Sequence, residues 1–159
     1  MARLGFTVEI AAPIDRVAAF FVPQRMPYWY GVEMESCIEV QGGAPDFCAG
    51  QKVRISGKLG RRKVSLTAVV TEYREQRVLE WRFQDAYGVR GLQRWDLEPF
   101  PIPSRLDTAR TRVRLRDEYE LPGRFGRVFD WLITRHAVAR RDRGDLARLK
   151  TLAERAKFT

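Results

Sequence analysis

Apolar residues recur with two different periods along the chain, and the change of period separates strands from helices. Close to the N-terminus every second residue is apolar, the period of a strand with one buried face: Leu4, Phe6, Val8 and Ile10. After Pro13, which suits the first position of a helix, the spacing becomes three or four residues, with Ile14, Val17, Phe20 and Phe21 on one side. The sequence therefore predicts a strand and then a helix, which Pro23 and Pro27 end.

The aromatic segment 28–32, YWYGV, follows and is expected to form a short helical or irregular turn. Alternation then returns in a second strand that carries Met34, Ser36, Ile38 and Val40 on one side. Glycines, prolines and charged residues divide the next stretch into five further strands. Their expected ranges are about Gln51–Lys58, Arg62–Tyr73, Val78–Gln84, Val89–Leu97 and Thr108–Leu121.

The last strand has the clearest alternation. One face carries Val113, Leu115, Asp117, Tyr119 and Leu121, and the other carries Arg112, Arg114, Arg116, Glu118 and Glu120. A helix is expected after Gly123 and as far as about Lys157. Its apolar stripe takes in Phe125, Val128, Phe129, Leu132, Ile133 and His136, and continues with Leu146, Leu149 and Ala153.

These elements come in the order strand, helix, helical turn, six strands and long helix. An antiparallel sheet covered by one long helix, an α+β architecture, is the economical way to bury their apolar faces. At 159 residues, without a repeat or an interdomain linker, the chain 1–159 is expected to be one domain.

Four segments of this order carry a family resemblance: VEIAAPIDRVAAFF, VVTEYREQRVLEWRF, GLQRWDLEP and TARTRVRLRDEYELPG, followed by an amphipathic C-terminal helix. The chain resembles the START/Bet v 1-like (SRPBCC) superfamily, and within it the polyketide cyclase/dehydrase and lipid-transport members. The resemblance implies a helix-grip fold, in which a curved seven-stranded sheet wraps around the long helix. It also implies a deep cavity between them for an apolar or amphipathic ligand.

Composition excludes some classes of protein and leaves others open. No apolar run approaches the ~20 residues of a membrane-spanning helix, and the N-terminus MARLGFTVEI lacks the apolar core of a signal peptide. With two cysteines, Cys37 and Cys48, the chain is expected to be cytoplasmic with free thiols. The net charge of +9 comes from basic residues spread along the chain, which favours a solvated basic surface over a nucleic-acid site.

Several kinds of chemistry lack their residues. One histidine and two cysteines eleven positions apart do not supply a metal site, and no cofactor is expected. GKLGRRK, residues 57–63, has glycines and basic residues without phosphate-loop spacing. Spacing assigns neither a base to activate Cys48 nor a serine to partner His136.

Asp117 and His136 are the polar residues that the pattern brings to the interior. Four residues of strand separate Asp117 from Leu121, and thirteen of helix separate Gly123 from His136, so the two side chains reach comparable levels if the helix packs back over the sheet. Both are expected to point into the space between helix and sheet. They are candidates for ligand contact, and the alternative is a satisfied core histidine with an acid bound to an arginine or a backbone donor.

Large side chains would form the walls of the same space. On successive strands the inward residues include Trp81 and Phe83, then Gln93 and Trp95, which can face Phe129 and Leu132 of the helix. With Asp117, Tyr119 and His136 they make up the candidate ligand-binding set, in which Gln93, Asp117 and His136 would orient the ligand. The alternative is that the aromatic residues are plain core. Tyr28, Trp29 and Tyr30 could frame the cavity mouth or anchor their segment to the core.

Three functions remain open. The favoured one is a binding module for a hydrophobic or aromatic small molecule, such as a lipid, a polyketide or a quinone-like compound. The second is an enzyme of the polyketide cyclase/aromatase type, in which inward polar groups move protons during ring closure and dehydration. The third is a protein whose basic surface binds RNA, a ribosome or an acidic membrane surface, the last as a transient contact.

Overall fold

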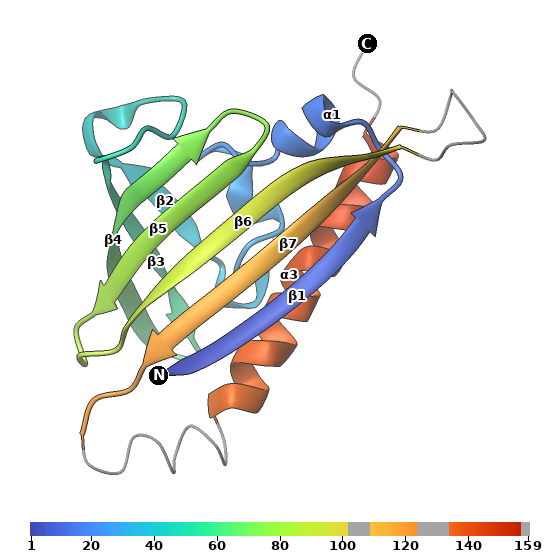
Figure 1. The fold of residues 1–159 in the computed structure, drawn as a ribbon. Coiled ribbons are helices and arrows are strands. Elements are labelled where there is room, and N and C mark those ends of the chain that lie inside the picture. Colours follow the sequence, from blue (N-terminus) through green and yellow to red (C-terminus); the bar gives the residue numbers. More distant parts are fainter. Residues whose placement is uncertain (102–108, 124–133, 157–159) are drawn as a thin grey trace.

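The computed structural model describes residues 1–101, 109–123 and 134–156, which form a curved seven-stranded antiparallel sheet with a long helix against its concave side (Figure 1). The strand order is β1-β7-β6-β5-β4-β3-β2. The strands are β1 (Ala2–Ile10), β2 (Cys37–Val40), β3 (Lys52–Leu59), β4 (Arg62–Arg74), β5 (Val78–Asp85), β6 (Arg90–Pro101) and β7 (Ala109–Glu120). The helices are α1 (Ile14–Ala18) and α3 (Arg135–Arg155), with 3₁₀ turns η1 (Met26–Tyr28), η2 (Val32–Met34) and η3 (Gln41–Gly43).

The predicted helix-grip architecture is confirmed, and the alternation on β7 explains its register. Thr111, Val113, Leu115, Asp117 and Tyr119 are buried, whereas the arginines between them are exposed or half-buried. On β1, Leu4 lies opposite Asp117 and Phe6 opposite Leu115. A shift of one residue would exchange the two faces of the strand, so this burial pattern fixes the pairing.

The chain between α1 and β3 departs from the predicted pattern. Strand β2 begins at Cys37, because the residues that alternate before it form η2. Gly31 and Glu35, on either side of η2, adopt left-handed backbone conformations with φ of 62° and 50°. The turn packs so closely on β3 that a Cβ at Gly57 would lie 2.8 Å from the carbonyl oxygen of Met34. The residues expected to form the first part of this strand therefore form a turn that packs closely against β3.

Hydrogen bonds connect the C-terminal part of α3 to the backbone at the end of β1. Its buried residues include Leu146, Leu149 and Ala153. Glu154 accepts a hydrogen bond from the backbone N–H of Ala11 at 2.9 Å, and Lys150 donates to the carbonyl oxygen of Glu9 at the same distance. Within the described ranges, no helix is both long and apolar enough to cross a membrane.

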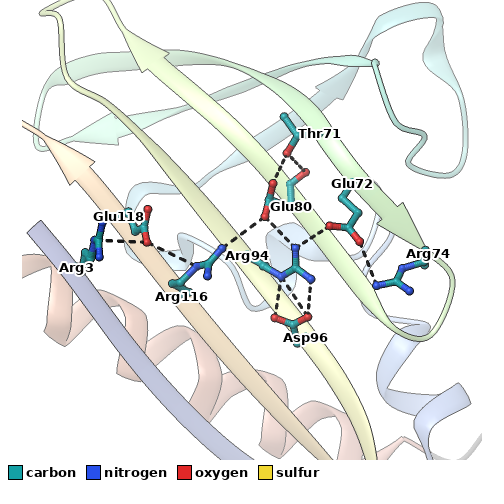
Figure 2. A network of polar contacts seen from close by, with 9 residues as sticks. All are labelled: Arg3, Thr71, Glu72, Arg74, Glu80, Arg94, Asp96, Arg116 and Glu118. Atoms are coloured by element: carbon teal, nitrogen blue, oxygen red, sulfur yellow. Dashed lines mark hydrogen bonds and ion pairs between the residues drawn. The ribbon is translucent and has the colours of Figure 1, made fainter. Parts of the chain in front are cut away.

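The outer face of the sheet carries a network of ion pairs between arginine and carboxylate side chains (Figure 2). Arg94 binds Glu72, Glu80 and Asp96 at 2.7, 3.0 and 2.9 Å. Arg116 connects Glu80 to Glu118, and Arg3 and Arg74 extend the chain of ion pairs at its two ends. Burial raises the pKa of Glu80, but hydrogen bonds from Thr71 and Arg94 outweigh it and hold the pKa below its ordinary value.

Candidate functional site

The interior between the sheet and the helical segments is built around a cluster of aromatic rings. Trp81 and Trp95, on neighbouring strands β5 and β6, lie with ring centroids 5.1 Å apart in an edge-to-face arrangement. Tyr30 lies 5.8 Å from both, and Trp29 lies 6.2 Å from Trp95. Phe21 packs on Trp29 and Trp95, at 5.0 and 6.3 Å. These rings fill the centre of the space under the sheet.

Gln93 is the centre of a chain of buried hydrogen bonds within this apolar surrounding. Its Oε1 accepts from the hydroxyl of Tyr30 at 2.7 Å and from Nε1 of Trp81 at 3.0 Å. Its Nε2 donates to Oδ2 of Asp117 at 3.2 Å. The same Asp117 oxygen accepts from Nη2 of Arg141 on α3 at 3.2 Å. A polar connection therefore runs from the 3₁₀ segment across the sheet to the long helix.

Helix α3 places two more carboxyl groups beside this chain. Asp142, 1% exposed, lies 3.4 Å from Arg141, and Asp145, 2% exposed, binds Arg148 at 2.5 Å and accepts from the backbone N–H of Gly31 at 3.2 Å. Arg148 also donates to Glu33 and to the carbonyl oxygen of Trp29. Among the described residues, no cluster of His, Cys, Asp or Glu is suited to hold a metal ion.

The proton affinities of these groups differ from those of the free side chains. Burial, and next the charge of Asp117, raises the pKa of Asp142 to about 8, so Asp142 is protonated at neutral pH. Burial also raises the pKa of Asp145, to about 6, against the lowering effects of Arg141, the Gly31 N–H and Arg148. Burial raises the pKa of the Tyr30 hydroxyl as well.

Some buried polar atoms of the site lack a hydrogen-bond partner in the part of the chain that the structure describes. They are Nε1 of Trp95, Nε of Arg141 and Oδ2 of Asp142. The nearby carboxyl group of Asp117 contributes, after burial, to the raised pKa of Asp142. Trp95 Nε1 and Arg141 Nε are thus buried donors for which the described residues supply no acceptor.

One end of the inner face is less tightly covered than the centre. Val64, Leu66 and Phe83 are half-buried there, near the turns that join β3 to β4 and β5 to β6. Gly91 is required beside Phe83, because a Cβ at this position would lie 2.7 Å from the phenyl ring and 2.1 Å from the carbonyl oxygen of Glu118. A separate hollow of about 200 Å³ lies at the opposite end, between α1 and the β4–β5 turn.

One known protein family matches nearly the whole chain. A family model described as polyketide cyclase/dehydrase and lipid transport matches residues 1–154. The chain belongs to this family. The resemblance found in the sequence is thereby confirmed.

Solved structures share the fold of this polyketide cyclase/dehydrase and lipid-transport chain at low identity. A solution structure from Arthrobacter aurescens has a TM-score of 0.70 and 16% identity over 97% of this chain and 87% of that one. The Zhui aromatase/cyclase from Streptomyces sp. R1128 has a TM-score of 0.69 and 20% identity, over 97% and 94%. A Chromobacterium violaceum protein has a TM-score of 0.67 and 16% identity, over 98% and 100%. No curated protein matches the chain.

Most of the predicted candidate residues that lie in the described part of this family member point inward. Trp81, Gln93, Trp95, Asp117 and Tyr119 are buried, and hydrogen bonds connect Trp81, Gln93 and Asp117. The half-buried residue among the candidates is Phe83. Phe129 and Leu132 lie outside the described residues. Whether any of these residues contacts a ligand stays a prediction.

The predicted inward position of His136 is wrong, and with it the pairing with Asp117. His136 is exposed on the first turn of α3. It lies nine residues before the buried Asp145, which at 3.6 residues per turn puts the two on opposite sides of the helix. Arg141 takes the expected place of the histidine, at 3.2 Å from Asp117. The alternative of an inward acid bound to an arginine is therefore the observed one.

Hydrophobic periodicity did not identify Arg141, Asp142 and Asp145 as site residues, although the sequence carried a signal for the two acids. Asp142 and Asp145 each lie four residues before a buried leucine of α3, Leu146 and Leu149, and so extend the buried stripe of the helix. In the aromatic segment, Trp29 and Tyr30 are anchored in the core, whereas Tyr28 is 68% exposed.

Proposed function

We propose that the protein binds a hydrophobic or aromatic small molecule, such as a lipid, a polyketide or a quinone-like compound, between the sheet and α3. The observation that carries the proposal is the set of unpartnered buried donors, Trp95 Nε1 and Arg141 Nε, inside an interior otherwise built of aromatic rings. An apolar pocket with a few polar groups is the usual design of a small-molecule site. A carbonyl or carboxyl oxygen on the ligand would satisfy these donors.

The half-buried end of the inner face supports a direction of entry. Leu66 and Phe83 would contact the apolar body of a ligand that enters there. Phe83 is two residues from Trp81, and Gly91 is two residues from Gln93, so the next step inward along each strand leads to the polar chain. The ligand would therefore enter with its polar end first. The polyketide class is supported by the similarity to the Streptomyces aromatase/cyclase.

Binding should change the tryptophan emission of the protein saturably, because Trp29, Trp81 and Trp95 lie in one buried cluster. Palmitate, menadione and emodin sample the three ligand classes and can each be titrated into the full chain. Gln93→Leu removes the amide that holds Asp117 and, through Asp117, Arg141 in place, and it should weaken binding of the compound that responds by about tenfold. Circular dichroism confirms that the variant is folded.

The matched control is Gln84→Leu, which makes the same replacement at an exposed position on β5. It should bind as the parent does. The proposal fails if none of the three compounds gives a saturable change, or if the two leucine variants lose affinity equally.

A second candidate function, a cyclase of the polyketide type, is favoured by one observation. Asp142 is a buried carboxylic acid, protonated at neutral pH, beside the carboxyl group of Asp117. In an aldol closure, a base removes a proton from a carbon next to a carbonyl, and an acid protonates the oxygen of the carbonyl that is attacked. Asp117 and Asp142 supply such a pair, and a positioned proton donor contributes about 10²–10⁴-fold to a rate.

The test of this candidate is turnover of a synthetic poly-β-ketone thioester, followed by the absorbance of the aromatic product. Asp142→Asn removes the proton donor and should lower turnover by at least about 100-fold, with substrate affinity retained. Asp145→Asn replaces another buried aspartate on the same helix and serves as the control. If its melting temperature equals that of the parent, its turnover should equal that of the parent too. Equal turnover in Asp142→Asn and the parent, or none in the parent, would exclude the cyclase.

A further inference from the structure

The β3–β4 hairpin tip carries basic residues without an acidic residue among them. Residues 58–63, KLGRRK, contain four basic residues and no acid, and Lys58, Arg61, Arg62 and Lys63 are all exposed. Elsewhere on the sheet Arg94, Arg112 and Arg116 each pair with a carboxylate, whereas Arg54 and Arg82 are exposed and have no ion pair within the described residues. In the residues that the structure covers, Arg61 and Lys63 have no ion pair.

The register of β3 and β4 makes this group of basic residues unfavourable for the stability of the sheet. Lys58 and Lys63 lie directly opposite each other on β3 and β4, and like charges in such pairs destabilise a sheet. Lys58 has a loose, exposed contact with Glu35 at 3.6 Å. The two lysines border a hollow of about 350 Å³ together with Glu35, Arg54, Ser56 and Ser65. Positive charge and hydroxyl donors thus gather at one place, where an anion would relieve the repulsion.

An aromatic residue from the neighbouring turn joins the basic tip. Tyr87, between β5 and β6, is 59% exposed. Its hydroxyl accepts a hydrogen bond from Arg62, whose guanidinium lies 4.7 Å from the tyrosine ring centroid. Both turns stand at the end of the sheet where Leu66 and Phe83 are half-buried. Exposed tyrosine beside lysine and arginine is a combination typical of membrane interfaces.

We infer that this hairpin tip docks the protein on the surface of an anionic lipid bilayer. The basic residues of the tip would lie among the headgroup phosphates, and Tyr87 would sit at the boundary between headgroups and acyl chains. The half-buried apolar end of the inner face then faces the lipid. An apolar ligand can pass between bilayer and protein at this end without crossing water. The inference adds a partner to the proposed ligand site and is testable without any ligand.

The experiment measures cosedimentation of the full chain with vesicles at neutral pH. One set of vesicles contains phosphatidylcholine alone, and in the other a third of the lipid is phosphatidylglycerol. We expect binding to the anionic vesicles that weakens as salt is added, and little binding to the neutral ones. Each basic residue near an anionic surface strengthens binding by roughly fivefold, so the triple variant Lys58→Ser/Arg61→Ser/Lys63→Ser should bind on the order of 100-fold more weakly.

A control variant removes the same amount of charge at the start of β3, in the β4–β5 turn and at the end of α3. Lys52→Ser/Arg77→Ser/Arg155→Ser replaces three exposed basic residues far from the hairpin tip and should bind the anionic vesicles almost as the parent does. The melting temperature of the hairpin variant should equal or exceed that of the parent, because the Lys58–Lys63 repulsion is gone.

Two further outcomes would overturn the inference. Equal losses in the two triple variants would mean that net charge alone attracts the protein to lipid. Retention of a labelled RNA or an acidic protein, without binding to anionic vesicles, would assign the basic tip to another partner. Because no ligand is added, loss of vesicle binding would leave the proposed small-molecule site untouched.

Discussion

Replacing Trp95 by alanine should lower the free energy of unfolding by about 3–5 kcal/mol, the range for removing a large aromatic side chain from a packed core. Trp95 is 1% exposed and touches Phe21, Trp29, Tyr30 and Trp81. These neighbours come from separate segments of the chain and cannot close together over the space left behind. Urea unfolding followed by far-ultraviolet circular dichroism measures the loss.

Two phenylalanine variants separate packing from hydrogen bonding. Trp95→Phe removes an indole N–H without a partner in the described residues, whereas Trp81→Phe removes one that donates to Gln93 at 3.0 Å. Trp81→Phe should therefore be the more destabilising by about 1 kcal/mol. A Trp95→Ala loss below about 1 kcal/mol would contradict a filled interior, since a side chain beside an open cavity leaves less packing to lose.

The stability of the parent should fall by about 2–3 kcal/mol between pH 5 and pH 7 on account of Asp142 alone. The pKa of Asp142 is raised from 3.8 to about 8 in the folded protein. Between pH 3.8 and about 8 the Asp142 carboxyl group is charged in the unfolded chain and protonated in the folded chain. The stability that this group contributes is therefore complete below pH 3.8 and decreases as pH rises to about 8. Each pH unit in this window costs about 1.4 kcal/mol. Asp145, with a pKa of about 6, acts in the same direction at the acid end.

Asp142→Asn should remove most of this slope, because asparagine keeps the shape of the protonated acid and does not titrate. Relative to the parent, the variant should gain stability from pH 5 to pH 7. Asp46→Asn, in an exposed loop, serves as the control and should keep the pH dependence of the parent. An unchanged slope in Asp142→Asn would show that the buried carboxyl group does not hold a proton at neutral pH.

Hydrophobic periodicity was enough to predict the sheet, because each long strand is buried on one face. On β7 the alternation runs without interruption from Thr111 to Tyr119, and it places Asp117 inside correctly. It failed at η2, where Met34 and Ser36 alternate like strand residues. The bend there depends on the fit of the turn against Gly57 of β3, a contact that no local pattern records.

The candidate site was harder to predict because charged residues occupy core positions of α3. The stripe of apolar residues indicated His136 as an inward residue, whereas hydrophobicity alone does not indicate a charged residue such as Asp142 or Asp145 as part of a core. Their surroundings come from residues distant in sequence, since Asp142 lies beside Asp117 of β7 and Asp145 accepts a hydrogen bond from the backbone N–H of Gly31. Tyr30 and Gln93 are likewise 63 residues apart along the chain and meet in the folded interior.

The strand order also bears on how the chain folds. Strand β1 is made first, yet its neighbour in the sheet is β7, so that Phe6 pairs with Leu115 and Ala2 with Tyr119. More than a hundred residues separate Phe6 from its partner Leu115 along the chain. Domains dominated by such distant pairings fold in milliseconds to seconds, slower than those with local contacts. Until β7 pairs with it, β1 lacks its neighbour in the sheet, and an unpaired strand edge of this kind favours aggregation of folding intermediates.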